Sequence, residues 1–119
     1  MTDPSHQESC LFCRVVAGEV PAEVVHSTAT AVAFRDISPQ APTHVLVVPR
    51  AHHENAVQLA AQEPEALAEV VKVADAVAQA EGLGGDYRIV FNTGAGSGQT
   101  VFHTHLHLLG GRPMNWPPG

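Results

Sequence analysis

The sequence has 119 residues, of which 45% are hydrophobic and 15% are charged. A chain of this length forms one domain of ordinary size, with enough buried apolar surface for a core without disulfides. Twelve acidic residues against six basic ones give a formal net charge of −6, which argues against binding to nucleic acid polymers. Because no apolar run approaches the roughly 20 residues that span a bilayer and no secretory signal is visible, we expect a cytoplasmic protein without a membrane segment.

The first half of the chain predicts a polar arm, a short helix and three strands. Residues 1–9 are polar and are expected to be a disordered arm, which leaves 10–119 as a single domain. The apolar positions within Cys10–Ala17, followed by Gly18, indicate a short helix with a glycine at its exit. Apolar runs then predict strands at Val24–His26, Ala31–Arg35 and His44–Val48.

The second half contains the strongest helical signal. Residues 63–81 carry apolar side chains every three or four positions, with Pro64 where a first turn tolerates proline and Gly82 at the exit. A weaker helical period begins near Glu54. Strands are expected at Tyr87–Asn92 and Phe102–Leu109, separated by a glycine-rich loop at 94–98. This element order, with short connections, predicts an α+β fold with an antiparallel sheet, one long helix and a short N-terminal helix.

Three histidines, His103, His105 and His107, stand at alternate positions. On a strand they would share one face over about 13 Å, at roughly 3.3 Å per residue. Two chemistries use this pattern. A pair of imidazoles can bind zinc, or one imidazole can be a nucleophile while its neighbour holds the charged group under attack. The preceding glycine-rich loop favours a phosphate as that group, because glycines let several backbone N–H groups converge on an anion.

The segment 103–109, HTHLHLL, resembles the signature of the histidine triad family, in which histidines alternate with apolar residues. Thr104 stands at a spacer that is usually apolar in the family. The segments 34–44 (FRDISPQAPTH) and 110–119 (GGRPMNWPPG) are similar to the Hint branch of that family, the purine nucleoside phosphoramidases. The similarity runs from about Cys10 to the C-terminus and implies a HIT-like fold.

The resemblance implies a hydrolase of purine nucleoside 5′-phosphoramidates that releases a nucleoside monophosphate and an amine through a nucleotidyl-histidine intermediate. It makes His105 the nucleophile, His107 a contact for the phosphoryl oxygens and Asp36 the partner of the ribose hydroxyls. The general acid is then the Thr100 hydroxyl or a protonated His107, so the implied catalytic residues are His105, His107 and Thr100. The implied nucleotide-binding residues are Phe12, Phe34, Asp36, Ile37, Asn92, Gly98, Gln99, Thr100, Val101 and His107.

Cys10 and Cys13 form a CxxC pair, which in a reducing cytosol is more typical of a metal or redox pair than of a structural disulfide. The resemblance implies a structural zinc ion, and no organic cofactor, with Cys10, Cys13, His44 and His103 as the Cys2His2 ligands that such zinc prefers. The alternative is two unligated thiols packed as small apolar residues. The other histidines, His6, His26, His52 and His53, are predicted to lie on the surface.

Two further functions stay open. The same intermediate could serve a dinucleoside polyphosphate hydrolase or a nucleotidyltransferase, and a zinc-stabilised module could bind nucleotides with little turnover. The resemblance also implies a homodimer, with the strands at 87–92 and 102–109 continuing across a two-fold axis. Trp116, in the proline-rich tail, would then lie near the neighbouring subunit.

Overall fold

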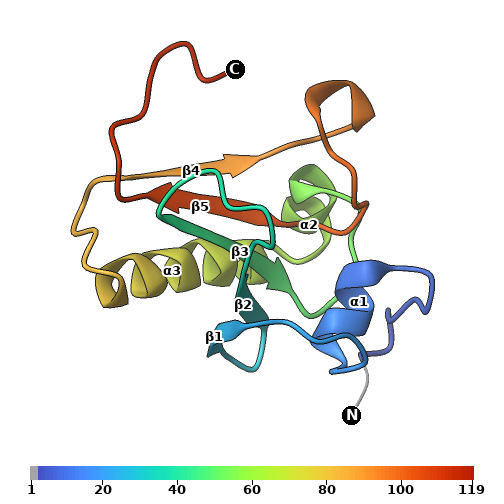
Figure 1. Ribbon diagram of the computed structural model, residues 1–119. Coiled ribbons are helices and arrows are strands. Elements are labelled where there is room, and N and C mark those ends of the chain that lie inside the picture. The colour runs from blue at the N-terminus through green and yellow to red at the C-terminus, as the bar shows by residue number, and fades with distance from the viewer. Residues whose placement is uncertain (1–2) are drawn as a thin grey trace.

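The computed structural model describes residues 3–119 as one five-stranded antiparallel sheet with helices packed on it (Figure 1). The strand order is β1-β2-β3-β5-β4, which confirms the predicted α+β class. The strands are β1 (Val24–Ser27), β2 (Ala31–Arg35), β3 (Thr43–Pro49), β4 (Tyr87–Phe91) and β5 (Leu106–Gly110). The helices are α1 (Leu11–Val16), α2 (Ala56–Gln62) and α3 (Pro64–Ala80), with one 3-10 turn, η1 (Ala95–Ser97).

Helix α3 lies along one face of the sheet (Figure 1). Proline is tolerated at its first position because a first-turn N–H has no partner within the helix, and Gly82, at a φ of +76°, turns the chain out at the other end. Its apolar stripe packs against the small and branched residues of the central strands. The buried core on this side comprises Ala31, Ala33, Val45, Val47, Val70, Val73, Ala74, Val77, Ala78, Leu106 and Leu108.

Helix α1 packs with the opposite face. Alternation along a strand sends successive side chains to opposite faces, so the residues between those of the α3 core point toward α1. The N-cap residue Cys10 accepts a hydrogen bond from the Cys13 backbone N–H at 3.3 Å, and this bond begins the helix. The buried cluster on this side comprises Cys10, Phe12, Cys13, Val15, Val32, Phe34, Leu46 and Val48.

Strand β5 begins at Leu106, four residues later than predicted. The reason lies at Thr104, whose backbone N–H and hydroxyl both donate to the His53 carbonyl, at 2.7 and 3.0 Å. This local anchor replaces the strand pairing that an extended Phe102–Leu109 segment would need. His103 and His105 therefore precede the strand, and His107 lies on it.

Strand β5 also lies inside the sheet, paired with β3 on one side and β4 on the other. It therefore cannot pair with a second chain, and the prediction that both β4 and β5 continue across a dimer axis is wrong for β5. Of these two strands, β4 alone lies at an edge of the sheet.

The N-terminal arm is described from Asp3 onward, and Met1 and Thr2 lie outside the described residues. Asp3–Ser9 turns against the start of α1 and the loop after β3, through hydrogen bonds to Cys10 and His52. That residues 1–9 are disordered stays a prediction. Among residues 3–119, no helix combines the length and the apolar character needed to cross a membrane.

Candidate active site and metal centre

The His105 ring is held in one tautomer by its own loop. Its Nδ1 lies 2.8 Å from the His103 carbonyl oxygen, which can only accept a hydrogen bond. Nδ1 therefore carries the proton in the neutral ring, and Nε2 keeps its lone pair. Burial lowers the pKa of His105, so this neutral form prevails at pH 7. The ring has the protonation state that a nitrogen nucleophile needs.

His107 is fixed by a second chain of hydrogen bonds. The Gln40 backbone N–H donates to His44 Nδ1 at 3.0 Å, so the proton of neutral His44 is on Nε2. That nitrogen lies 2.9 Å from His107 Nδ1, which leaves the His107 proton on Nε2. Burial, with the neighbouring His105 and His44, lowers the pKa of His107 to about 4. His107 is thus a neutral hydrogen-bond donor at pH 7.

Both rings line a cavity of about 510 Å³ between α1 and the sheet. Its inner wall is apolar and includes Phe12 and Phe34, whose rings meet edge to face with centroids 5.5 Å apart. Phe12 also contacts the His105 ring, with centroids 5.0 Å apart. The cavity is thus lined by apolar side chains together with two imidazoles. Of the nucleotide-binding residues implied by the sequence, its wall contains Phe12, Phe34, Asp36, Ile37, Thr100, Val101 and His107.

Asn92, Gly98 and Gln99, which the structure also describes, are not part of that wall. The Gln99 amide is buried and holds the loop together. Its nitrogen donates to the carbonyls of Glu54 and Val101, and its oxygen accepts from the Gly94 N–H. The Gln99 backbone N–H donates to the Gly94 carbonyl. These donors are engaged within the loop in this structure, and the nucleotide-binding roles of Asn92, Gly98 and Gln99 stay predictions.

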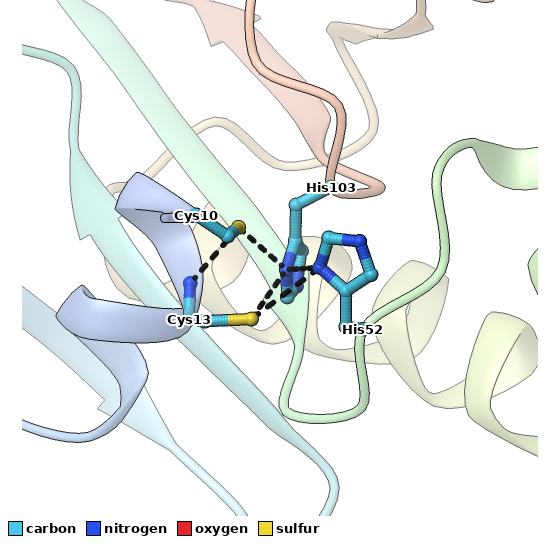
Figure 2. A group of neighbouring side chains, drawn as sticks. All are labelled: Cys10, Cys13, His52 and His103. Atoms are coloured by element: carbon cyan, nitrogen blue, oxygen red, sulfur yellow. Dashed lines mark hydrogen bonds between the residues drawn. The ribbon is translucent and has the colours of Figure 1, made fainter. Parts of the chain in front are cut away.

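A second group of side chains gathers around the first turn of α1 (Figure 2). Cys10 and Cys13 come from α1, His103 from the loop before β5 and His52 from the loop after β3. His103 Nδ1 lies 3.4 Å from the Cys10 sulfur, 3.5 Å from the Cys13 sulfur and 3.2 Å from His52 Nδ1. The Cys13 sulfur lies 3.3 Å from His52 Nδ1.

These four residues fit a tetrahedral metal. At the usual Zn–S and Zn–N bond lengths, ligand atoms are separated by roughly 3.3–3.8 Å, close to the spacings found here. His103 Nε2 lies 2.8 Å from the Pro49 carbonyl, so the proton is on Nε2 and Nδ1 faces the sulfurs with its lone pair. Burial raises the pKa of the Cys13 thiol to about 11, and a cation among the four ligands would reverse that effect.

His52 takes the place that the sequence assigned to His44. Strands β3 and β5 are antiparallel, with His44 opposite Leu109 and Val47 opposite Leu106. Residues that precede Leu106 therefore lie beside the end of β3 and the loop after it, and the start of β3 is far from His103. The expectation that His44 lies beside Cys10, Cys13 and His103 is wrong, and His52 is half-buried in that group instead of lying free on the surface. The antiparallel pairing of β3 with β5 is the signal that would have identified His52, and not His44, as the neighbour of His103.

Comparison with known proteins identifies the family of this chain. The family model of the HIT domain matches residues 17–114. The chain belongs to the HIT domain family. The resemblance to histidine triad proteins is thereby confirmed, and the HIT domain match includes the whole 103–107 segment. Cys10 and Cys13 lie before its first matched residue.

Relatives of this HIT domain include enzymes. The chain is 41% identical over 108 residues to the purine nucleoside phosphoramidase of Escherichia coli (strain K12), covering 90% of this chain and 91% of the relative. It is 45% identical to the 14 kDa zinc-binding protein of Zea mays, covering 92% and 87% of the two chains. A crystal structure of a HIT family hydrolase from Legionella pneumophila Philadelphia 1 matches with a TM-score of 0.89 and 51% identity, covering 93% of this chain and all of that one. The HIT domain is thus of the hydrolase class.

Proposed function

We propose that the protein hydrolyses purine nucleoside 5′-phosphoramidates, of the adenosine phosphoramidate type, through a nucleotidyl-histidine intermediate. The observation that carries the proposal is the fixed tautomer of His105 at the wall of the cavity, because it leaves Nε2 as a neutral nucleophile. The name of the Escherichia coli relative supports the substrate class. The base would pack against apolar side chains of the cavity wall, among them Phe12 and Phe34, and the Asp36 carboxylate would accept hydrogen bonds from the ribose hydroxyls.

In the first step, His105 Nε2 would form a bond to phosphorus while the bond from phosphorus to the amine nitrogen breaks. The amine must take a proton as it leaves. His107 Nε2–H would donate a hydrogen bond to a phosphoryl oxygen, where negative charge grows. In the second step, water would attack phosphorus, the bond to His105 would break, and nucleoside monophosphate would leave.

The proton for the amine has two candidate donors. Thr100 is exposed at the edge of the cavity and carries a hydroxyl. Neutral His107 is a weak acid, but a bound phosphoryl anion would raise its pKa by favouring the imidazolium. A kcat loss in Thr100→Val with His107 intact would assign the proton to the hydroxyl.

Turnover of adenosine 5′-phosphoramidate by the wild type, His105→Ala and His26→Ala tests the proposal. His26 lies on β1 and does not line the cavity, so it controls for the loss of an imidazole. His105→Ala is expected to reduce kcat by about 10³-fold or more, because it removes the nucleophile, while AMP still binds. If the wild type bound AMP but did not hydrolyse the phosphoramidate, the protein would be a nucleotide-binding module and not an enzyme. Faster turnover of dinucleoside polyphosphates would change the substrate class.

We propose further that Cys10, Cys13, His52 and His103 hold a structural zinc ion. The donor set, the spacing of the four ligand atoms and the fixed His103 tautomer support this assignment. So does the name of the Zea mays relative. When bound, zinc would cross-link α1 to the loops that carry His52 and His103. Zinc content per chain should fall in His52→Ala and remain unchanged in His44→Ala; the reverse result would contradict His52 as the fourth ligand.

We also propose a homodimer formed through the edge strand β4, in the cytoplasm. β4 is half-buried, with Ile89 39% exposed. The opposite edge, β1, is short and carries an irregularity between Val24 and His26, features that discourage pairing with another chain. Trp116, 83% exposed in the tail, is available to a neighbouring subunit. Sedimentation should give a dimer for the wild type and Val24→Glu and a monomer for Ile89→Glu; a monomeric wild type would contradict the proposal.

A further inference from the structure

The N-terminal segment Asp3–Ser9 contacts the loop that carries His52. The His52 backbone N–H donates to the Ser5 hydroxyl oxygen at 2.6 Å. That hydroxyl donates in turn to the Asp3 carboxylate at 2.5 Å, and the same carboxylate oxygen accepts the Ser5 backbone N–H at 2.8 Å. Ser5 is therefore oriented by Asp3, and its free lone pair points at the backbone of a proposed metal ligand.

The same segment also contacts Cys10. The Cys10 backbone N–H donates to the Gln7 carbonyl at 3.0 Å. Through Ser5 and Gln7, the segment thus accepts hydrogen bonds from two of the four residues in the Cys10, Cys13, His52 and His103 group.

The segment is anchored independently of these contacts. The His6 side chain is only 12% exposed, with its Nε2 2.7 Å from Glu8 and 3.9 Å from Glu19, just beyond α1. His6 also lines a small cavity with Val16, Ala17 and Arg50. This anchorage places Ser5 and Gln7 against the cysteine helix and the His52 loop at the same time.

We propose that Asp3–Ser9 is an outer layer of the metal centre and that Ser5 is a positioning residue for His52. Hydrogen bonds to groups around a metal ligand fix its orientation, and their loss typically costs 10- to 100-fold in metal affinity. The Ser5 hydroxyl accepts a hydrogen bond from the His52 backbone. It therefore fixes the position of the His52 backbone, from which the imidazole extends, without contacting the metal. The inference rests on the proposed zinc site and adds residues that lie before the matched HIT domain.

Zinc affinity of the full chain, measured by competition with a chromogenic chelator, tests this role. Ser5→Ala is expected to raise the zinc Kd about 10-fold, and Ser5→Thr, which keeps the hydroxyl, should restore it. Ser9→Ala, at an exposed serine of the same segment, is the matched control and should leave the Kd unchanged. Asp3→Asn should change the Kd in the same direction as Ser5→Ala but less, and it replaces Ser5→Ala if that variant does not fold.

The visible spectrum of the cobalt-substituted protein gives a second readout that a general loss of stability would not move. Ser5→Ala should alter the absorption bands of tetrahedral cobalt, because the His52 ring is less firmly placed, whereas Ser9→Ala should not. A wild type that binds neither zinc nor cobalt would end the zinc proposal. A wild type that binds both, with Ser5→Ala identical to it in Kd and spectrum, would leave the zinc site and overturn the role of Ser5.

Discussion

The two faces of the sheet are made by the same strands, but one face forms the apolar core and the other carries the candidate site. On the α3 face, Val45, Val47, Leu106 and Leu108 are fully buried and entirely apolar. On the α1 face, the alternate positions of the same strands include His44 and His107, and α1 with its N-cap adds Cys10, Cys13 and Phe12. Period-two alternation lets one strand contribute to a sealed core and to a polar site. Substitutions at adjacent positions of one strand can therefore affect stability in one case and catalysis in the other.

The largest effect should come from the sealed face. Leu108→Ala removes a fully buried side chain from the α3 core and should lower the free energy of unfolding by about 2–5 kcal/mol. Leu109→Ala, on the adjacent position and the opposite face, should cost much less because Leu109 is only partly buried. Denaturant unfolding of both variants measures the difference. Equal losses would break the distinction between the faces.

On the polar face, His44→Ala should change catalysis more than stability. His44 fixes the His107 proton on Nε2, and its loss frees the His107 ring to rotate or change tautomer. A kcat reduction of about 10- to 100-fold is expected, with a smaller change in KM. His44→Gln, whose amide can donate to His107 Nδ1, should recover part of the loss. An unchanged kcat in His44→Ala would remove His44 from the site.

The buried imidazoles also set the pH dependence. Burial lowers the pKa of His105, and the pKa of His107 is lowered to about 4. Because the neutral ring is the nucleophile, kcat/KM should fall as the pH drops through these lowered values. The acid limb should therefore have its midpoint below 6.5, the ordinary value for histidine. Rates between pH 4 and 8 measure it, and a midpoint at 6.5 or above would contradict burial as the controlling factor.

The smallest effect should come from the ion pair that joins β2 to the end of α3. The Arg35 guanidinium contacts both Glu81 oxygens, at 2.8 and 3.2 Å, and lowers the pKa of Glu81. Since both side chains are partly exposed, Glu81→Gln should cost only about 0.5–1 kcal/mol.

The pH sign follows from the lowered pKa of Glu81. The contribution is present above the unfolded pKa and is lost as the pH falls through the lowered folded pKa. Glu23→Gln, at a more exposed partner of the same arginine, should have almost no effect. Chemical denaturation at pH 7 and pH 3 checks both variants, and a Glu81→Gln loss that persists undiminished at pH 3 would contradict the ion pair.

Local patterns predicted the elements that depend on neighbouring residues. The strand predicted at Ala31–Arg35 has the bounds of β2, and the helix predicted at 63–81 differs from α3 by one residue at each end. Contacts between segments that are distant in the chain could not be predicted from local sequence patterns. The start of β5 depends on the bond from Thr104 to the His53 carbonyl, and the choice of His52 over His44 depends on strand register. The loop role of Gln99 depends on Glu54, 45 residues away.

The group formed by Cys10, Cys13, His52 and His103 has a consequence for the folding of the whole chain. Its members are separated by 39 residues between Cys13 and His52 and by 51 between His52 and His103. A metal that joined them would close two long loops, as a cross-link does, and would lower the entropy of the unfolded chain. The apoprotein should then unfold less cooperatively, with α1 released before the sheet that α3 covers.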